Sequence, residues 1–169
     1  MHLGRNKLTS VPASLGRLAA LTRLHLSENQ LTSVPAELGK LTALTLLDVN
    51  NNKLKSVPAA LGGLTVLQDL RLRNNQMTSV PAELGRLTAL KLLYLSMNQL
   101  TSVPEELGRL TALEVLHLYV NQLTSVPKEL GNLKALKSLE IGGNPDLAAL
   151  LDKVEQLSTT HGGKCFIRI

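Results

Sequence analysis

Aromatic residues are scarce in this chain of 169 residues, which holds no tryptophan, one phenylalanine and two tyrosines. The apolar fraction, 44%, is nevertheless ordinary for a single globular domain. The buried core must therefore be aliphatic, and we expect it to consist mainly of leucine and valine at fixed places. Because aromatic side chains are so few, the place of each tyrosine carries information about function.

Cysteine is nearly absent as well. Cys165 stands alone, which excludes a disulfide within the chain. The sequence also lacks a signal-peptide pattern, an apolar run of membrane-spanning length and an N-x-S/T glycosylation site. These absences predict a reducing, cytoplasmic location and no membrane partner.

Long runs of one charge are missing too. The 18 Lys and Arg residues outnumber the 13 Asp and Glu residues, for a net charge of +5, but the signs are mixed along the chain. Such mixing is typical of a solvated face, whereas specific nucleic-acid binding needs a concentrated basic stripe. We therefore expect no nucleic-acid partner.

Patterns that carry chemistry are also lacking. No serine, threonine or cysteine can be assigned to a nucleophile–base pair, and no glycine-rich loop stands where it could hold a phosphate. We expect a non-catalytic protein without a cofactor.

The chain consists instead of a 23-residue unit, L-x-x-L-x-L-x-x-N-x-L-t-S-V-P-x-x-L-G-x-L-t-a, written over and over. A truncated first copy occupies residues 1–20, and a half copy occupies residues 136–144. Full copies begin at Leu21, Leu44, Leu67, Leu90 and Leu113. A fixed period of this length predicts a solenoid in which each copy forms one coil. We expect a repeat array over residues 1–144 and a C-terminal cap over residues 145–169.

Each copy reads as a short strand, a turn and a helical return. Leu24 and Leu26 alternate with polar neighbours, as in a half-buried strand. The proline of the return can start about one helical turn, and the glycine suits the place just past its end. An asparagine stands in the turn of every copy, and its amide can bond the backbone of its own coil and of the next. This predicted structural ladder comprises Asn6, Asn29, Asn52, Asn75, Asn98, Asn121 and Asn144.

These motifs resemble the leucine-rich repeat family, and the S-V-P-x-x-L-G-x-L half is similar to its 23-residue intracellular subclass. That subclass includes Ras-interacting scaffold proteins, plant intracellular Ras-group-related proteins, and bacterial and protist repeat proteins. The resemblance implies an α/β solenoid: a right-handed arc with a parallel concave sheet of about seven short strands and short helical or 3-10 turns on the convex side. It also implies a protein or peptide as partner, with small GTPases, kinases and phosphatases as candidate classes.

The pattern breaks at both ends of the array. After Asn144, apolar residues at helical spacing predict a capping helix, formed by Leu147, Leu150, Leu151, Val154 and Leu157, and residues 164–169 suggest a short closing strand. The first copy starts inside a strand, and its uncapped edge predicts self-association through Leu3, Leu8 and Leu15. A structural or self-associating array is accordingly the alternative to a binding module.

The copies differ mainly at their outward strand positions. Both tyrosines fall there, in an apolar group of Leu92, Tyr94, Met97, Val115, His117, Tyr119 and Val120. A charged group lies beside it, made of Asp48, Asp69, Arg71 and Arg73, with Leu46 in the same set of positions. Such composition is typical of a protein interface, so we expect the partner to bind this concave face. The alternative is that β-propensity or packing among these side chains places them there.

The histidines at outward positions invite a metal hypothesis. His2 and His25 share a column with Asp48, and Glu28 lies nearby. Zinc accepts such ligands, but side chains that project in parallel from a sheet do not converge on one point. We expect solvent-exposed histidines and no metal site.

Overall fold

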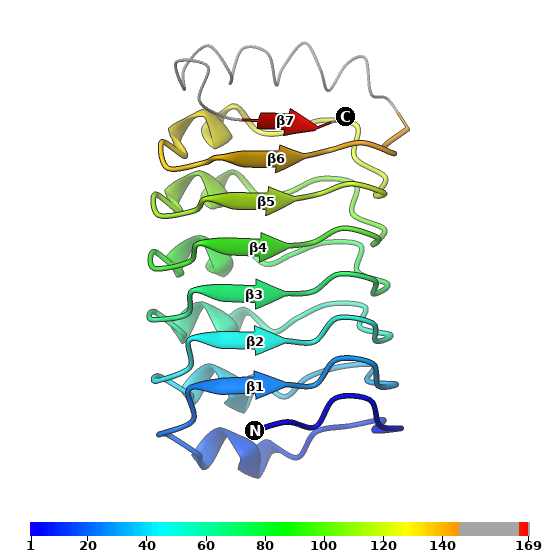
Figure 1. Ribbon diagram of the computed structural model, residues 1–169, viewed down its shortest axis with the longest axis vertical. Helices are drawn as coiled ribbons and strands as arrows, with labels where there is room; N and C mark the ends of the chain where they lie inside the picture. Colours follow the sequence, from blue (N-terminus) through cyan, green and yellow to red (C-terminus); the bar gives the residue numbers. More distant parts are fainter. Residues whose placement is uncertain (146–165, 169) are drawn as a thin grey trace.

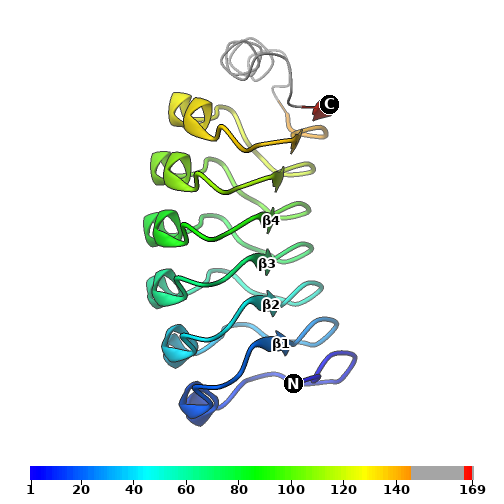
Figure 2. The ribbon, with the colours of Figure 1, turned by 60° about the vertical axis from the view of Figure 1, so that its left-hand side comes forward.

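The structure is a computed structural model, and it describes residues 1–145 and 166–168. The chain winds upward as a stack of right-handed coils, with the strands on the near face and short helices behind them (Figure 1). The edge-on view shows that the stack bends, so that the strands line the inner, concave side and the helices the outer, convex side (Figure 2). The predicted right-handed leucine-rich repeat arc is confirmed.

One parallel sheet joins the strands in the order β1 to β7. Residues one repeat apart are direct partners, as Arg23 is to Leu46 and Leu46 is to Asp69. Every strand has three residues: β1 is Arg23–His25, β2 Leu46–Asp48, β3 Asp69–Arg71, β4 Leu92–Tyr94, β5 Val115–His117, β6 Ser138–Glu140 and β7 Phe166–Arg168.

The seven strands are not all the expected ones. In the truncated first copy, His2 forms only an isolated parallel bridge to His25 instead of a strand. The seventh strand is β7 at the C-terminal end, which pairs in parallel with β6 and confirms the closing strand expected within residues 164–169. The predicted capping helix falls within residues 146–165, outside the described residues.

Within residues 1–145, the convex side consists of 3-10 helices of five residues each. These helices are η1 (Ala13–Arg17), η2 (Ala36–Lys40), η3 (Ala59–Gly63), η4 (Ala82–Arg86), η5 (Glu105–Arg109) and η6 (Lys128–Asn132). Each follows a proline in extended conformation, which sets φ for the first turn.

The role expected for the repeated glycine is wrong. Gly85 lies inside η4 rather than past its end, and it has no positive φ. A Cβ atom at Gly85 would lie 2.3 Å from the carbonyl oxygen of Glu106 in the next coil. The glycine is therefore required because neighbouring 3-10 helices approach so closely that no side chain fits between them.

The core between sheet and helices is aliphatic, as expected. In the described coils its buried apolar residues are leucines, valines, Met77 and Ile141, most of them without any exposed surface. None of the helices in residues 1–145 is long and apolar enough to cross a membrane.

The asparagine ladder is confirmed for coils within the array. The Oδ1 atom of Asn75 accepts a hydrogen bond from the backbone N–H of Leu54 in the preceding coil, at 3.0 Å. Its Nδ2 group donates to the carbonyl of Val49 in that coil and to Leu72 in its own, each at 3.1 Å. Asn6 is exposed and donates only within its own coil, to Leu3 and Gly4. Each asparagine after Asn6 thus joins two coils.

The first coil presents a smaller apolar edge than expected. Leu15 is buried, and Leu3 and Leu8 are partly buried against the core. Leu15 is therefore a wrong candidate for a contact surface. Met1 and Leu18 are the exposed large apolar residues of this coil, at 42% and 41%.

Candidate functional site

The outward positions of the repeat belong to two structural settings. Because each strand has only three residues, the third and fifth repeat positions lie on the sheet, while the seventh and eighth lie in the loop that follows. The expectation that all four are strand positions is wrong. The eighth position is in fact left-handed, with φ of 53–57° at Arg5, Glu28, Asn51, Asn74, Met97 and Val120.

The two tyrosines meet on the concave face through a histidine. The rings of Tyr94 and His117 lie on neighbouring strands, 5.0 Å apart between centroids and nearly perpendicular at 85°. The ring of Tyr119, in the loop after β5, lies 6.2 Å from that of His117. All three side chains are half-buried. The structure therefore brings these predicted site residues together, and we call them the aromatic cluster.

Two arginines stack on the aromatic cluster. The guanidinium carbon of Arg71 lies 5.9 Å from the ring centroid of Tyr94, and that of Arg73 lies 5.7 Å from the ring centroid of Tyr119. A cation over an aromatic face is attracted to the electron-rich ring. Burial, followed by the nearby Asp69 carboxylate, raises the pKa of Tyr94. Part of the predicted site therefore consists of side chains that pack against one another, which the sequence analysis gave as an alternative to partner binding.

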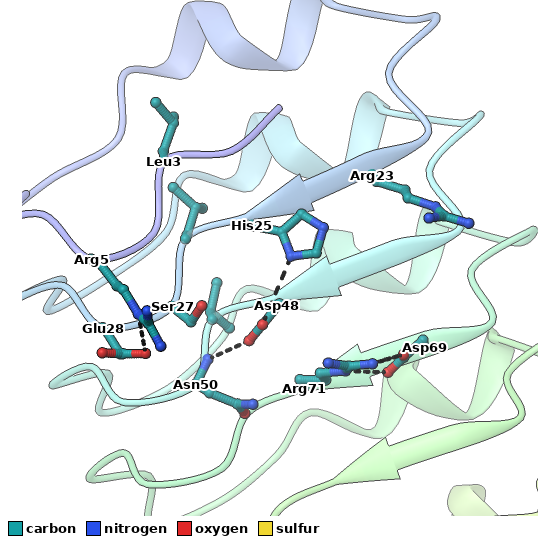
Figure 3. Close-up of polar contacts among 12 residues, drawn as sticks. Leu3, Arg5, Arg23, His25, Ser27, Glu28, Asp48, Asn50, Asp69 and Arg71 are labelled. Carbon is teal, nitrogen blue, oxygen red and sulfur yellow. Dashed lines mark hydrogen bonds and ion pairs between the residues drawn. The ribbon is translucent and has the colours of Figure 1, made fainter.

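The predicted acidic residues are less available than expected. Asp48 and Asp69 are only 7% and 8% exposed, although they occupy the concave face. Arg71 donates to both carboxylate oxygens of Asp69, with Nη2 at 2.7 Å from Oδ2 (Figure 3). Asp48 accepts from the backbone N–H of Asn50 at 3.0 Å (Figure 3). These carboxylates are largely occupied by partners in the same chain.

The pKa of His25 and the pKa of His117 are both lowered, which favours the neutral imidazoles. Burial is the main cause that lowers the pKa of His25, followed by the charge of His2. Burial also lowers the pKa of His117, opposed by Glu140, whose Oε2 atom lies 3.7 Å from His117 Nδ1. The rings of His2 and His25 stack face to face at 4.4 Å rather than pointing at a common centre. Within residues 1–145, no group of three or more His, Cys, Asp or Glu side chains is placed to hold a metal ion.

Apolar residues border the aromatic cluster. Leu92, Met97 and Val115 are partly exposed, and Val120 is 47% exposed. Val120 is also left-handed, with φ of 53°, a conformation that strains a β-branched residue. Leu46 lies apart from the cluster and lines, with Leu92, an open groove across the strand starts.

Two neighbours of the aromatic cluster were not among the site residues predicted from the sequence. Glu140 approaches His117, as described above, and Ser96 is fully buried in the loop after β4. The repeat register does carry a signal for both. Ser96 lies in the same column as Arg73 and Tyr119, and Glu140 pairs with His117 one repeat away.

Solved structures with the same fold come from bacteria and plants. A leucine-rich repeat protein of Leptospira interrogans matches with a TM-score of 0.92 and 35% identity, over 100% of this chain and 42% of that one. The ectodomain of the plant membrane receptor kinase GASSHO1/SCHENGEN3 from Arabidopsis thaliana, in complex with CASPARIAN STRIP INTEGRITY FACTOR 2, gives 0.75 and 38%, over 80% of this chain and 17% of that one. The plant peptide hormone receptor RGFR1, in complex with RGF2, gives 0.65 and 27%, over 80% and 26%.

This chain spans less than half the length of each of these proteins. A search of curated proteins gives no match. The family model described as a leucine-rich repeat region matches residues 1–94 and 47–161, which together cover most of the chain. Together with the stacked 23-residue coils and the asparagine ladder, this match shows that the chain belongs to the leucine-rich repeat family.

Proposed function

We propose that this protein is a non-catalytic binding module that holds a protein or peptide on its concave face, centred on Tyr94, His117 and Tyr119. The observation that carries the proposal is the exposed apolar border of this cluster. Val120 is 47% exposed in a strained, left-handed conformation, a place that asparagine fills in two other coils. An exposed apolar side chain in a strained backbone conformation is unfavourable for the isolated fold, which favours a contact between Val120 and another molecule.

The structural neighbours support the same class of function. Two of them are plant receptors solved in complex with CASPARIAN STRIP INTEGRITY FACTOR 2 and with RGF2. Within the intracellular subclass that the repeat resembles, small GTPases, kinases and phosphatases are the partner classes to test first. We also propose a reducing, cytoplasmic location, which the lone Cys165 supports and fractionation of the source cells would test.

Affinity capture from the source cell, followed by measurement of Kd for the captured protein, tests the proposed function. The variant is the double substitution Tyr94→Ala and Tyr119→Ala, and the matched control is Arg86→Ala with Arg109→Ala on the convex helices. If the tyrosines are binding hot spots, the first variant weakens binding by at least about 2 kcal/mol, and the control leaves it unchanged. Equal affinity of wild type and the tyrosine variant would exclude this site.

Self-association through the first coil is the alternative function, and the exposure of Met1 and Leu18 favours it. Light scattering at high protein concentration distinguishes the two. A dimer mass that returns to the monomer mass in Leu18→Glu, with no partner captured, would support the alternative.

A further inference from the structure

One buried hydroxyl group on the concave side has no hydrogen-bond partner. The side chain of Ser96 is fully buried, and no donor or acceptor in the described residues reaches its Oγ atom. Leaving a buried hydroxyl unpaired costs free energy, so such a group in a folded protein needs an explanation.

Two side chains from the flanking coils meet across Ser96. Arg73 precedes it by one repeat and Tyr119 follows it by one repeat. Backbone hydrogen bonds place the three coils in sequence, from Asn74 N to the Ser96 carbonyl at 3.0 Å and from Met97 N to the Tyr119 carbonyl at 2.9 Å. Arg73 and Tyr119 lie two coils apart, yet the Arg73 guanidinium carbon lies 5.7 Å from the centroid of the Tyr119 ring. Their side chains therefore span the coil that carries Ser96.

Arg73 has no carboxylate partner among the residues that the structure describes. Its neighbour Arg71 is held by both oxygens of Asp69, whereas Arg73 makes no ion pair in the described part of the chain. Besides the Tyr119 ring, its side chain contacts the sulfur of Met97, with Nη2 at 3.6 Å from Sδ. A thioether is a weak acceptor, so the hydrogen-bonding capacity of this exposed guanidinium is largely unused.

We propose that Arg73 and Ser96 form a subsite for a carboxylate, namely the side chain of an aspartate or glutamate within the bound peptide. This inference rests on the proposed function of the concave face. The entering carboxylate separates Arg73 from Tyr119, accepts paired hydrogen bonds from the guanidinium, and accepts one from the uncovered Ser96 hydroxyl. Side-chain rearrangement of this size is common when proteins bind. Tyr119, Met97 and Val120 then contact an apolar residue next to the acidic one.

The surrounding charges favour a single negative charge over a phosphate. Asp69 occupies Arg71, and Glu140 lies beside His117, so carboxylates already surround the cluster. The Arg73 guanidinium balances one negative charge, and the Ser96 hydroxyl adds a donor without charge. The neighbouring carboxylates repel a dianion more strongly than a single carboxylate. The sheet continues on both sides of the subsite, from β1 to β6, so a peptide can pass across it. We therefore assign the carboxylate to a side chain within the peptide rather than to a chain terminus.

Selection of short random peptides on the full chain tests the subsite and requires no identified partner. The peptides are displayed with fixed sequence on both sides, so that only side-chain carboxylates are offered. We expect enrichment of Asp or Glu beside an aromatic or aliphatic residue. Changing that acid to its amide should raise Kd about tenfold, the loss of a charge-assisted contact. Phosphoserine at the same place should bind less tightly; tighter binding would assign the subsite to phosphate and overturn the proposal.

Variants of the protein connect the effect to these residues. Arg73→Gln should raise Kd about tenfold and abolish the difference between the acidic peptide and its amide, while the control Arg23→Gln should preserve both. Ser96→Ala should weaken binding without lowering the melting temperature, an outcome that a purely structural role does not produce. If the difference in Kd between the acidic peptide and its amide is as large in Arg73→Gln as in the wild type, the proposal is wrong.

The failure of the subsite and the failure of the proposed function give different results. Peptides that depend on Tyr94 and Tyr119 but show no acidic preference would exclude the subsite and retain the binding face. Selected peptides that are unaffected by the double tyrosine variant, or no selected peptides at all, would count against both.

Discussion

The 23-residue repeat is constant in the turn of each coil and variable at the outward positions of its strand. In the turn, every asparagine from Asn29 onward repeats one set of bonds because buried backbone groups of two coils need the same partner each time. On the strand, outward residues such as Arg71 and Tyr94 are partners in adjacent coils yet differ in size and charge. The difference shows that residues which join adjacent coils are the same in each repeat, whereas residues that face outward from the sheet can vary.

Gly85→Ala should have the largest effect on the invariant side of this comparison. The added Cβ would lie 2.3 Å from the Glu106 carbonyl oxygen, so the two helices must move apart. We expect a loss of about 3 kcal/mol in the free energy of unfolding, measured by urea denaturation. Arg86→Ala, one residue later and exposed, is the control and should change it little. Equal stability of both variants would show that the coils can separate freely.

Asn75→Ala should be the next largest change. It leaves the buried Leu54 amide without an acceptor, which costs about 1–3 kcal/mol. The Val49 and Leu72 carbonyls each lose one of two donors and keep the asparagine of a neighbouring coil. Asn6→Ala removes two hydrogen bonds from an exposed asparagine and should lower the free energy of unfolding by less. Gln76→Ala, at the exposed residue next to Asn75, should also lower it by less. Chemical denaturation of the three variants checks this order, and a larger loss for Asn6→Ala would contradict the role assigned to the ladder.

Val120→Asn tests the variable side, where we expect stability to rise. Asparagine tolerates the left-handed conformation better than a β-branched residue, so the free energy of unfolding should increase by about 1 kcal/mol. Binding of a concave-face peptide should weaken at the same time. The reverse substitution at an equivalent place, Asn74→Val, should destabilise the fold. A fall in stability for Val120→Asn would mean that its side chain serves packing rather than binding.

Mild acid should give the smallest effect, through the histidines of the same face. Because the pKa of His25 and His117 is lowered from 6.5 in the folded protein, the neutral imidazole stabilises the fold. That contribution is present above pH 6.5 and is lost as the pH falls through 6.5 towards the folded-state pKa. The melting temperature should therefore drop between about pH 7.5 and about pH 5.5, and the drop should shrink in His117→Gln. An unchanged profile in that variant would remove His117 from this account.

The fold could be predicted from the sequence because its determinants recur. Leucine spacing, the asparagine of each turn and the proline before each 3-10 helix act locally or between identical neighbours, so one copy explains all. The role of the glycine could not be predicted in this way because its requirement, the close approach of Glu106 to Gly85, is a distance between coils that no single copy contains.

The site could be predicted only as a set of residues that share a face. The positions of Tyr94, His117 and Tyr119 followed from the register. The hydrogen bonds that occupy Asp48 and Asp69 did not, because they depend on the geometry of the loop and side chain two residues later in the same coil. Ser96 was missed because a repeat column shows which residues share a place and not how deeply each one is buried. Their binding role stays a prediction.

The asparagine ladder has a direction. The amide of Leu31 is satisfied by Asn52, which lies 21 residues later, and the same offset recurs up to Leu123 and Asn144. During synthesis, a coil therefore cannot complete its buried hydrogen bonds until the following coil has left the ribosome. Coils should become ordered in the nascent chain one repeat behind the point of elongation, so the array is built as a delayed sequence rather than all at once.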